Sequence, residues 1–162
     1  MPHPGAYERA LRPLLPAAAG YARSIVRSRH DVEDAVQQAA LRGWERIDQY
    51  DRSRPFKGWW FAILRNCCFD MLRRSAAART GPLGGLDPPA PDEPDPVDWE
   101  GLDDALRGLS QDHHDILRLR YFGGLKYDEI AAALAIPRGT VMSRLHLARK
   151  ALAAQMRKEE EA

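Results

Sequence analysis

Between residues 127 and 152, hydrophobic positions recur at helical spacing in two short segments separated by a tight corner. Ile130, Ala131 and Leu134 share one face of the first segment. Pro137 ends the corner and suits a helix start, where its missing N–H costs nothing. The apolar stripe of the second segment consists of Val141, Leu145, Ala148 and Leu152. The pattern predicts a helix-turn-helix with a basic second helix, or alternatively a helical hairpin that only packs.

Helical spacing of apolar residues also predicts helices in the first half of the chain. The first covers residues 5–28, where Pro13 and Pro16 split or restart it. Asp31 is the expected N-cap of the second helix, and Pro55 starts the third. The positions expected to be buried on the second helix are Val32, Ala35, Val36, Ala39, Trp44 and Ile47. Those on the third are Phe56, Trp59, Trp60, Ile63, Leu64, Cys67, Met71 and Leu72.

The stretch from residue 80 to residue 96 interrupts this periodicity with Gly, Pro, Asp and Glu, which predicts a linker. Helical spacing resumes near Val97. Ser110 is a suitable N-cap for a further helix, which Gly123 and Gly124 should end. No strand pattern longer than a few residues occurs, and no internal repeat is found.

These elements predict an all-α protein of two small helical modules, residues 5–79 and 97–157, joined by a flexible acidic Pro-rich linker over residues 80–96. Charge follows the same division. Lys and Arg dominate both ends of the chain, whereas residues 81–115 hold 10 acidic residues and 1 basic residue. The basic blocks can attract phosphate backbones, and the acidic middle would be repelled by them.

Composition argues against several classes of protein. Cys67 and Cys68 are adjacent and no Cys-x-x-Cys spacing occurs, so a reduced cytoplasmic protein without disulfides is expected. The longest apolar run, residues 59–64, is too short to span a membrane, and the N-terminus lacks the pattern of a signal peptide. His113 and His114 have the wrong spacing for a metal site with the cysteines. No nucleophile–base pair or phosphate loop occurs, so neither catalysis nor a cofactor is expected.

Two longer stretches match a single known family. The first, residues 31–74, reads DVEDAVQQAALRGWERIDQYDRSRPFKGWWFAILRNCCFDMLRR and resembles region 2 of bacterial sigma factors of the extracytoplasmic-function (ECF) class. The second, residues 109–152, reads LSQDHHDILRLRYFGGLKYDEIAAALAIPRGTVMSRLHLARKAL and resembles region 4 of the same class. Either stretch alone is only suggestive, whereas the two together, in this order and across a short linker, are highly specific.

The resemblance implies a promoter-specificity subunit of RNA polymerase without catalytic activity. Its first module would bind core RNA polymerase and capture the melted −10 element, and its second would bind duplex −35 DNA. An anti-sigma factor is a usual partner in this family. Two other functions stay open: a sigma-mimicking protein that sequesters a regulator, and a stand-alone helix-turn-helix repressor. The repressor leaves the aromatic-rich first module unexplained.

One set of residues matches the family's polymerase-binding helix. It consists of Asp34, Gln37, Gln38, Leu41 and Arg42. Gln38 stands where a Glu is usual in the family. The alternative is a solvated helix face, whose acids offset the helix dipole in the first turn.

A second set matches the family's −10 contacts: Tyr50, Arg54, Phe56, Lys57, Arg65, Asn66, Asp70, Arg73 and Arg74. Proteins hold single-stranded DNA by stacking bases on aromatic side chains in a basic groove. Trp59, Trp60 and Ile63 recur at helical spacing and are interpreted as core instead. Tyr50 and the loop over residues 51–56 are the candidates for base capture, and the arginine pair would also suit a helix end without DNA.

A third set is expected to meet −35 DNA: Arg138, Thr140, Ser143, Arg144, His146, Arg149 and Lys150. Thr140 and the helix N-terminus would meet phosphate, and Ser143 and His146 would reach base edges. Met142 and Leu147 occupy positions where relatives commonly carry Lys or Arg. Leu147 lies nearly opposite the apolar stripe and is expected to be exposed.

Overall fold

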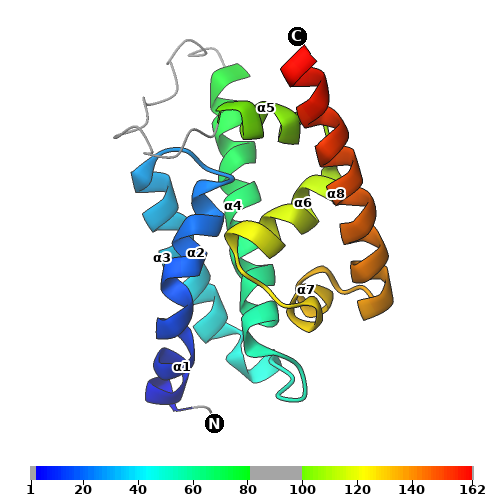
Figure 1. Cartoon of the computed structure of the whole chain (residues 1–162). Helices are drawn as coiled ribbons and strands as arrows, with labels where there is room; N and C mark the ends of the chain where they lie inside the picture. Colours follow the sequence, from blue (N-terminus) through cyan, green and yellow to red (C-terminus); the bar gives the residue numbers. More distant parts are fainter. Residues whose placement is uncertain (1–2, 81–99, 162) are drawn as a thin grey trace.

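The computed structural model describes residues 3–80 and 100–161, which consist of helices and connecting turns without a strand (Figure 1). The all-α prediction is therefore confirmed over these ranges. The predicted linker, apart from Thr80, and the expected start near Val97 lie outside the described residues. No helix in the described part of the chain is long and apolar enough to cross a membrane.

Residues 3–80 form the first helical module. Its elements are α1 (Pro4–Leu11), η1 (Arg12–Leu14), α2 (Leu15–Arg23), α3 (Arg29–Glu45), η2 (Ile47–Gln49) and α4 (Phe56–Thr80). Pro13 lies within η1 and Pro16 in the first turn of α2, so the prolines divide the first helix as predicted. The N-cap of α3 was predicted wrongly. Ser28, not Asp31, caps this helix, because its side chain accepts a hydrogen bond from the Asp31 N–H at 3.2 Å.

Residues 100–161 form the second module. Its elements are α5 (Glu100–Arg107), α6 (Gln111–Leu117), the π-helical turn η3 (Arg118–Phe122), α7 (Tyr127–Leu134) and α8 (Arg138–Glu161). Ser110 caps α6 as predicted, and Gly124 takes a positive φ of 65° just after η3. The corner between α7 and α8 turns at Ala135, whose φ of 53° is left-handed. The predicted helix-turn-helix is thus present.

Two predicted core residues are not buried. Trp44 near the end of α3 and Leu72 on α4 remain 36% and 38% exposed, because helical spacing gives the face of a helix on which a residue lies but not whether a neighbour covers it. Conversely, Phe61 and Cys68 on α4 are fully buried, although the pattern of apolar residues did not single them out. These two follow Gly58 along one side of α4 at helical spacing, and that side faces the second module.

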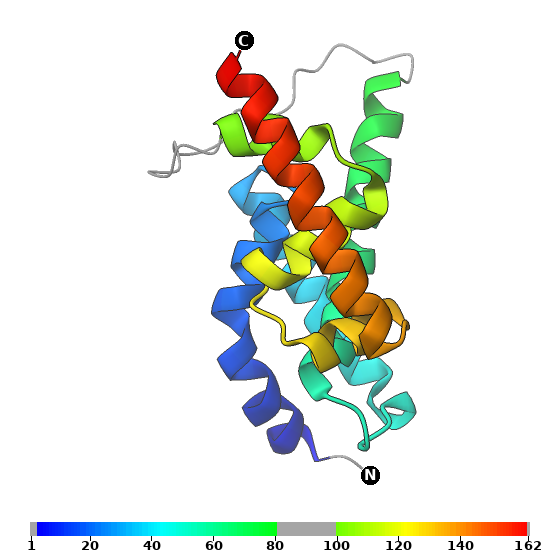
Figure 2. The same ribbon diagram turned by 45° about the vertical axis from the view of Figure 1, so that its right-hand side comes forward.

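The two modules share one hydrophobic core. α4 stands between α3 on one side and α7 on the other, and α8 runs along the outside of α6 and α7 (Figures 1 and 2). α2 also contacts η3. Gly58 of α4 lies so close to α7 that a Cβ there would be 2.8 Å from the Cβ of Ala132. The second module is therefore packed directly against the first.

Candidate polymerase and nucleic-acid interfaces

The outer face of α3 is open to solvent. Leu41 is 65% exposed and Gln37 is also exposed, while Gln38 is half-buried beside them. Asp34 Oδ2 lies 3.3 Å from Nε2 of His30, which is one turn earlier in the same helix. The helix amphipathicity explains this arrangement, because Val32, Ala35 and Ala39 occupy the opposite face and are buried. The predicted polymerase-binding residues thus form one accessible stripe.

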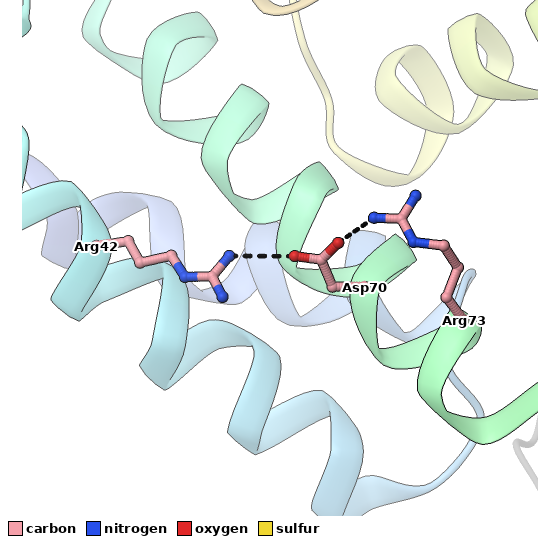
Figure 3. A network of polar contacts seen from close by, with 3 residues as sticks. All are labelled: Arg42, Asp70 and Arg73. Carbon is pink, nitrogen blue, oxygen red and sulfur yellow. Dashed lines mark hydrogen bonds and ion pairs between the residues drawn. The ribbon is translucent and has the colours of Figure 1, made fainter. Parts of the chain in front are cut away.

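Arg42 links that stripe to α4 through Asp70. Arg42 Nη1 lies 3.3 Å from Asp70 Oδ2, and Arg73 pairs with the other oxygen of the same carboxylate (Figure 3). Hydrogen bonds from Arg73 and Arg42 lower the pKa of Asp70 from its ordinary value. Asp70 therefore orients one arginine of the predicted polymerase set and one of the predicted −10 set. The sequence pattern did not reveal this link, since residues 42 and 70 are far apart in the chain.

The loop before α4 has an aromatic base and a polar rim. Tyr50 packs against Phe56 and Trp59, with ring centroids 5.5 and 5.0 Å away. Its hydroxyl donates a 2.6 Å hydrogen bond to the carbonyl of Arg54. At the rim, Asp51 accepts hydrogen bonds from the hydroxyl and the N–H of Ser53, which lower the pKa of Asp51. The loop therefore has an internally bonded shape.

The predicted −10 residues of α4 divide into those that contact the second module and those that face solvent. Lys57 and Arg65 reach across to the second module: Lys57 Nζ donates to the carbonyl of Gly124 at 3.2 Å, and Arg65 Nη2 lies 2.6 Å from Asp115 Oδ2. Asn66 and Arg74 are exposed. The predicted −10 set is therefore not one continuous open surface in this arrangement.

The outer face of α8 is accessible. The predicted apolar stripe is confirmed, with Val141, Leu145 and Ala148 fully buried. Ser143, His146 and Lys150 are exposed, Thr140 is half-buried, and Met142 and Leu147 are 52% and 54% exposed. At the start of the helix, Nε of Arg138 lies 3.5 Å from Oδ1 of Asp128 in α7. Arg144 turns inward and lines a cavity of about 330 Å³ between the modules, together with Arg65, Asp112 and Asp115.

No group of three or more metal-ligating side chains occurs in the described ranges. His113 and the buried Cys67 and Cys68 accordingly form no cluster there. Burial raises the pKa of the Cys68 thiol to about 12 and raises that of Cys67 as well.

Comparisons with known proteins identify both modules. The family described as Sigma-70 region 2 matches residues 10–78, and Sigma-70, region 4 matches residues 99–152. The ECF RNA polymerase sigma factor SigL of Mycobacterium tuberculosis is 34% identical over 138 residues, covering 82% of this chain and 78% of SigL. This chain belongs to the ECF sigma factors. SigW of Bacillus subtilis is 29% identical over 79% of this sigma factor and 76% of SigW.

Solved structures agree over nearly the whole chain. The sigma factor RpoE in complex with the anti-sigma factor NepR from Bartonella quintana has a TM-score of 0.71 and 26% identity, covering 93% of this chain and 96% of RpoE. CnrH in complex with the cytosolic domain of CnrY has a TM-score of 0.68 and 25% identity, covering 96% and 90% of the two chains. The protein is a promoter-specificity subunit, and as a sigma factor it binds core RNA polymerase and promoter DNA.

Tyr121 is a feature of this sigma factor that sequence reasoning missed. It is 58% exposed at the end of η3, and Arg149 Nε of α8 donates a 2.7 Å hydrogen bond to its hydroxyl. The guanidinium carbon also lies 5.7 Å from the ring centroid. Tyr121 thus fixes the position of one predicted −35 residue. Its place directly after Arg118 and Arg120 was the available signal.

Proposed function

We propose that this sigma factor starts transcription through three separate surfaces. The α3 stripe around Leu41 binds core polymerase, α4 with the loop before it captures the −10 element, and the outer face of α8 reads −35 DNA. The accessible α3 stripe carries the proposal. Leu41 is 65% exposed, Trp44 three residues later is 36% exposed, and Arg42 is held in place by Asp70. Tryptophan and arginine are enriched at protein-binding hot spots, so these two residues beside an exposed leucine suit such a contact.

Run-off transcription with purified core polymerase tests this function directly. The protein alone added to core should give transcripts from a promoter-bearing fragment, which is the expected result for a sigma subunit. A sigma-mimicking protein that sequesters a regulator would give none, and core without added protein is the control. Absence of transcripts from any fragment of the source genome would overturn the proposal.

An anti-sigma factor is the proposed regulatory partner. One solved structure that matches this chain, the sigma factor RpoE with NepR, is a complex with an anti-sigma factor, and in another CnrH is bound to the cytosolic domain of CnrY. We further propose that the protein acts in the cytoplasm and without catalysis of its own, as its relatives named as sigma factors imply. Its role is to position polymerase and DNA.

We expect Met142→Lys to tighten −35 binding. Met142 is 52% exposed on the outer face of α8, so a lysine there can meet a phosphate without disturbing the core. One added phosphate contact should steepen the slope of log affinity against log salt by about 0.9. Because phosphate contacts do not read sequence, the gain should be similar on cognate and scrambled duplexes.

The measurement is a salt titration of the full chain by fluorescence anisotropy. Met156→Lys is the matched control, since Met156 is exposed on the same helix but far from its N-terminal turns. It adds the same charge and should leave the slope unchanged. Equal effects of the two substitutions would show that the proposed face of α8 does not meet the backbone.

A further inference from the structure

The second module covers part of the proposed −10 surface. Two residues of that surface, Lys57 and Arg65, are bonded to groups of the second module rather than facing open solvent. Lys57 donates to the Gly124 carbonyl at 3.2 Å, at the turn that follows η3. Arg65 pairs with Asp115 of α6 at 2.6 Å. Both cations therefore already have partners in this arrangement.

In the Arg65–Asp115 pair the carboxylate is buried and the guanidinium is half-buried. The side chain of Asp115 is only 6% exposed and that of Arg65 is 29% exposed. Gln111 Nε2 donates to the second oxygen of the same carboxylate at 3.1 Å, so both oxygens of Asp115 are occupied. The guanidinium carbon of Arg65 lies 5.0 Å from the ring centroid of Phe69. A buried carboxylate is tolerated only while its partner stays in place.

A second close contact between the modules lies about two turns before Arg65 on α4. Gly58 of α4 leaves no room for a Cβ, which would collide with the carbonyl oxygen of Glu129 and lie 2.8 Å from Ala132 Cβ. α7 therefore lies directly on the first turns of α4, the part of that helix that follows the base-capture loop. A DNA strand that bound Lys57 and Arg65 would have to take the place of the Gly124 carbonyl and of Asp115 in the second module.

We propose that the Arg65–Asp115 ion pair is an interdomain latch that keeps region 4 on the −10 face and so inhibits this sigma factor without any other protein. In the closed arrangement the side chain of Arg65 is only 29% exposed and its Nη2 is paired with Asp115, so closure and strand capture compete for this residue. The inference rests on the proposed −10 role of α4. Opening of the two modules is then a required step before promoter melting.

Two independent substitutions in the full chain test the latch. Asp115→Asn removes the charge that Arg65 pairs with. Gly58→Ala leaves the ion pair intact but forces α7 away, and alanine is a better helix former than glycine, so α4 itself is retained. Small-angle X-ray scattering should show a larger radius of gyration for both variants, and circular dichroism should show unchanged helix content.

Each substitution has a matched control. Asp104→Asn makes the same change of charge at an exposed carboxylate that pairs with Arg107 within α5. Gly139→Ala makes the same change of volume where a Cβ would meet nothing within 4 Å. Neither control should change the radius of gyration. Unchanged dimensions of both latch variants would overturn the latch.

The consequence for DNA is measured with a fluorescein-labelled single-stranded oligothymidylate. Both latch variants should bind it at least about tenfold more tightly, since the apparent affinity rises with the populated fraction of the open form. Binding to duplex DNA through the already accessible face of α8 should stay unchanged. If the variants open but bind the single strand no more tightly, the latch does not inhibit DNA binding. In that case the proposed −10 role of α4 is wrong, whereas the latch contacts themselves stand.

Discussion

Replacing Gln37 and Leu41 together by Asp is expected to abolish co-purification of this sigma factor with core RNA polymerase. Leu41 is the most exposed large apolar side chain in the described residues, and Gln37 lies one turn before it on the same stripe of α3. The double change removes the apolar side chain at the proposed contact. It also forces two unpaired carboxylates to lose their water when polymerase binds, which costs further free energy. Truncating a single hot-spot residue costs at least about 2 kcal/mol, so the two changes together should cost about 4 kcal/mol, a loss of roughly 1000-fold in affinity.

The matched control introduces two carboxylates elsewhere on the first module. Leu15 on α2 is 37% exposed and Gln49 in η2 is exposed, and neither belongs to the α3 stripe. Leu15→Asp with Gln49→Asp should leave core binding intact. Circular dichroism should give the same helix content for both double variants. Retained core binding by the α3 variant would show that the polymerase contact lies on another surface.

Leu145→Ala should produce a large loss of stability. Leu145 is fully buried in the core that α8 shares with α6 and α7, and Leu→Ala changes at such positions cost about 2–5 kcal/mol. Leu147 is two residues away and 54% exposed. Leu147→Ala removes the same atoms from the surface, where the expected change is within about 0.5 kcal/mol.

Urea denaturation followed by circular dichroism measures both variants. The midpoint of unfolding should fall sharply for Leu145→Ala and stay near that of the unsubstituted protein for Leu147→Ala. If the two variants had equal midpoints, the orientation of α8 would be wrong, and Leu147 would have to face the core. The pair of variants thus tests which face of α8 is free for DNA.

Local rules predicted most of the fold correctly. The helix-turn-helix, the Ser110 cap and the break at the prolines all follow from spacing and capping within a few residues. The N-cap of α3 was placed wrongly because Ser28 and Asp31 both have suitable side chains, and the choice depends on where the preceding chain leaves α2. Trp44 was assigned to the core because periodicity does not show where a neighbouring helix ends.

Contacts between the modules could not be predicted from the sequence. Phe61, Arg65 and Cys68 lie on one side of α4. That side carries both apolar and charged residues, because it packs against the second module rather than facing solvent or the core of the first module. Asp115 gave no signal, since an acidic residue in a short helix is ordinarily exposed. The accessible sites on α3 and α8 were predicted as sets of residues. Their assignment to polymerase and DNA stays a prediction.

The burial of both cysteines has a consequence for how this protein can be controlled. Cys67 and Cys68 have no exposed surface, and their raised pKa values keep the sulfurs as thiols, whereas oxidants and electrophiles attack the thiolate. In the arrangement described here, peroxide or a disulfide stress therefore finds no accessible thiol on this protein. A cell that uses this sigma factor against oxidative damage through thiol chemistry would need a separate thiol sensor upstream of it.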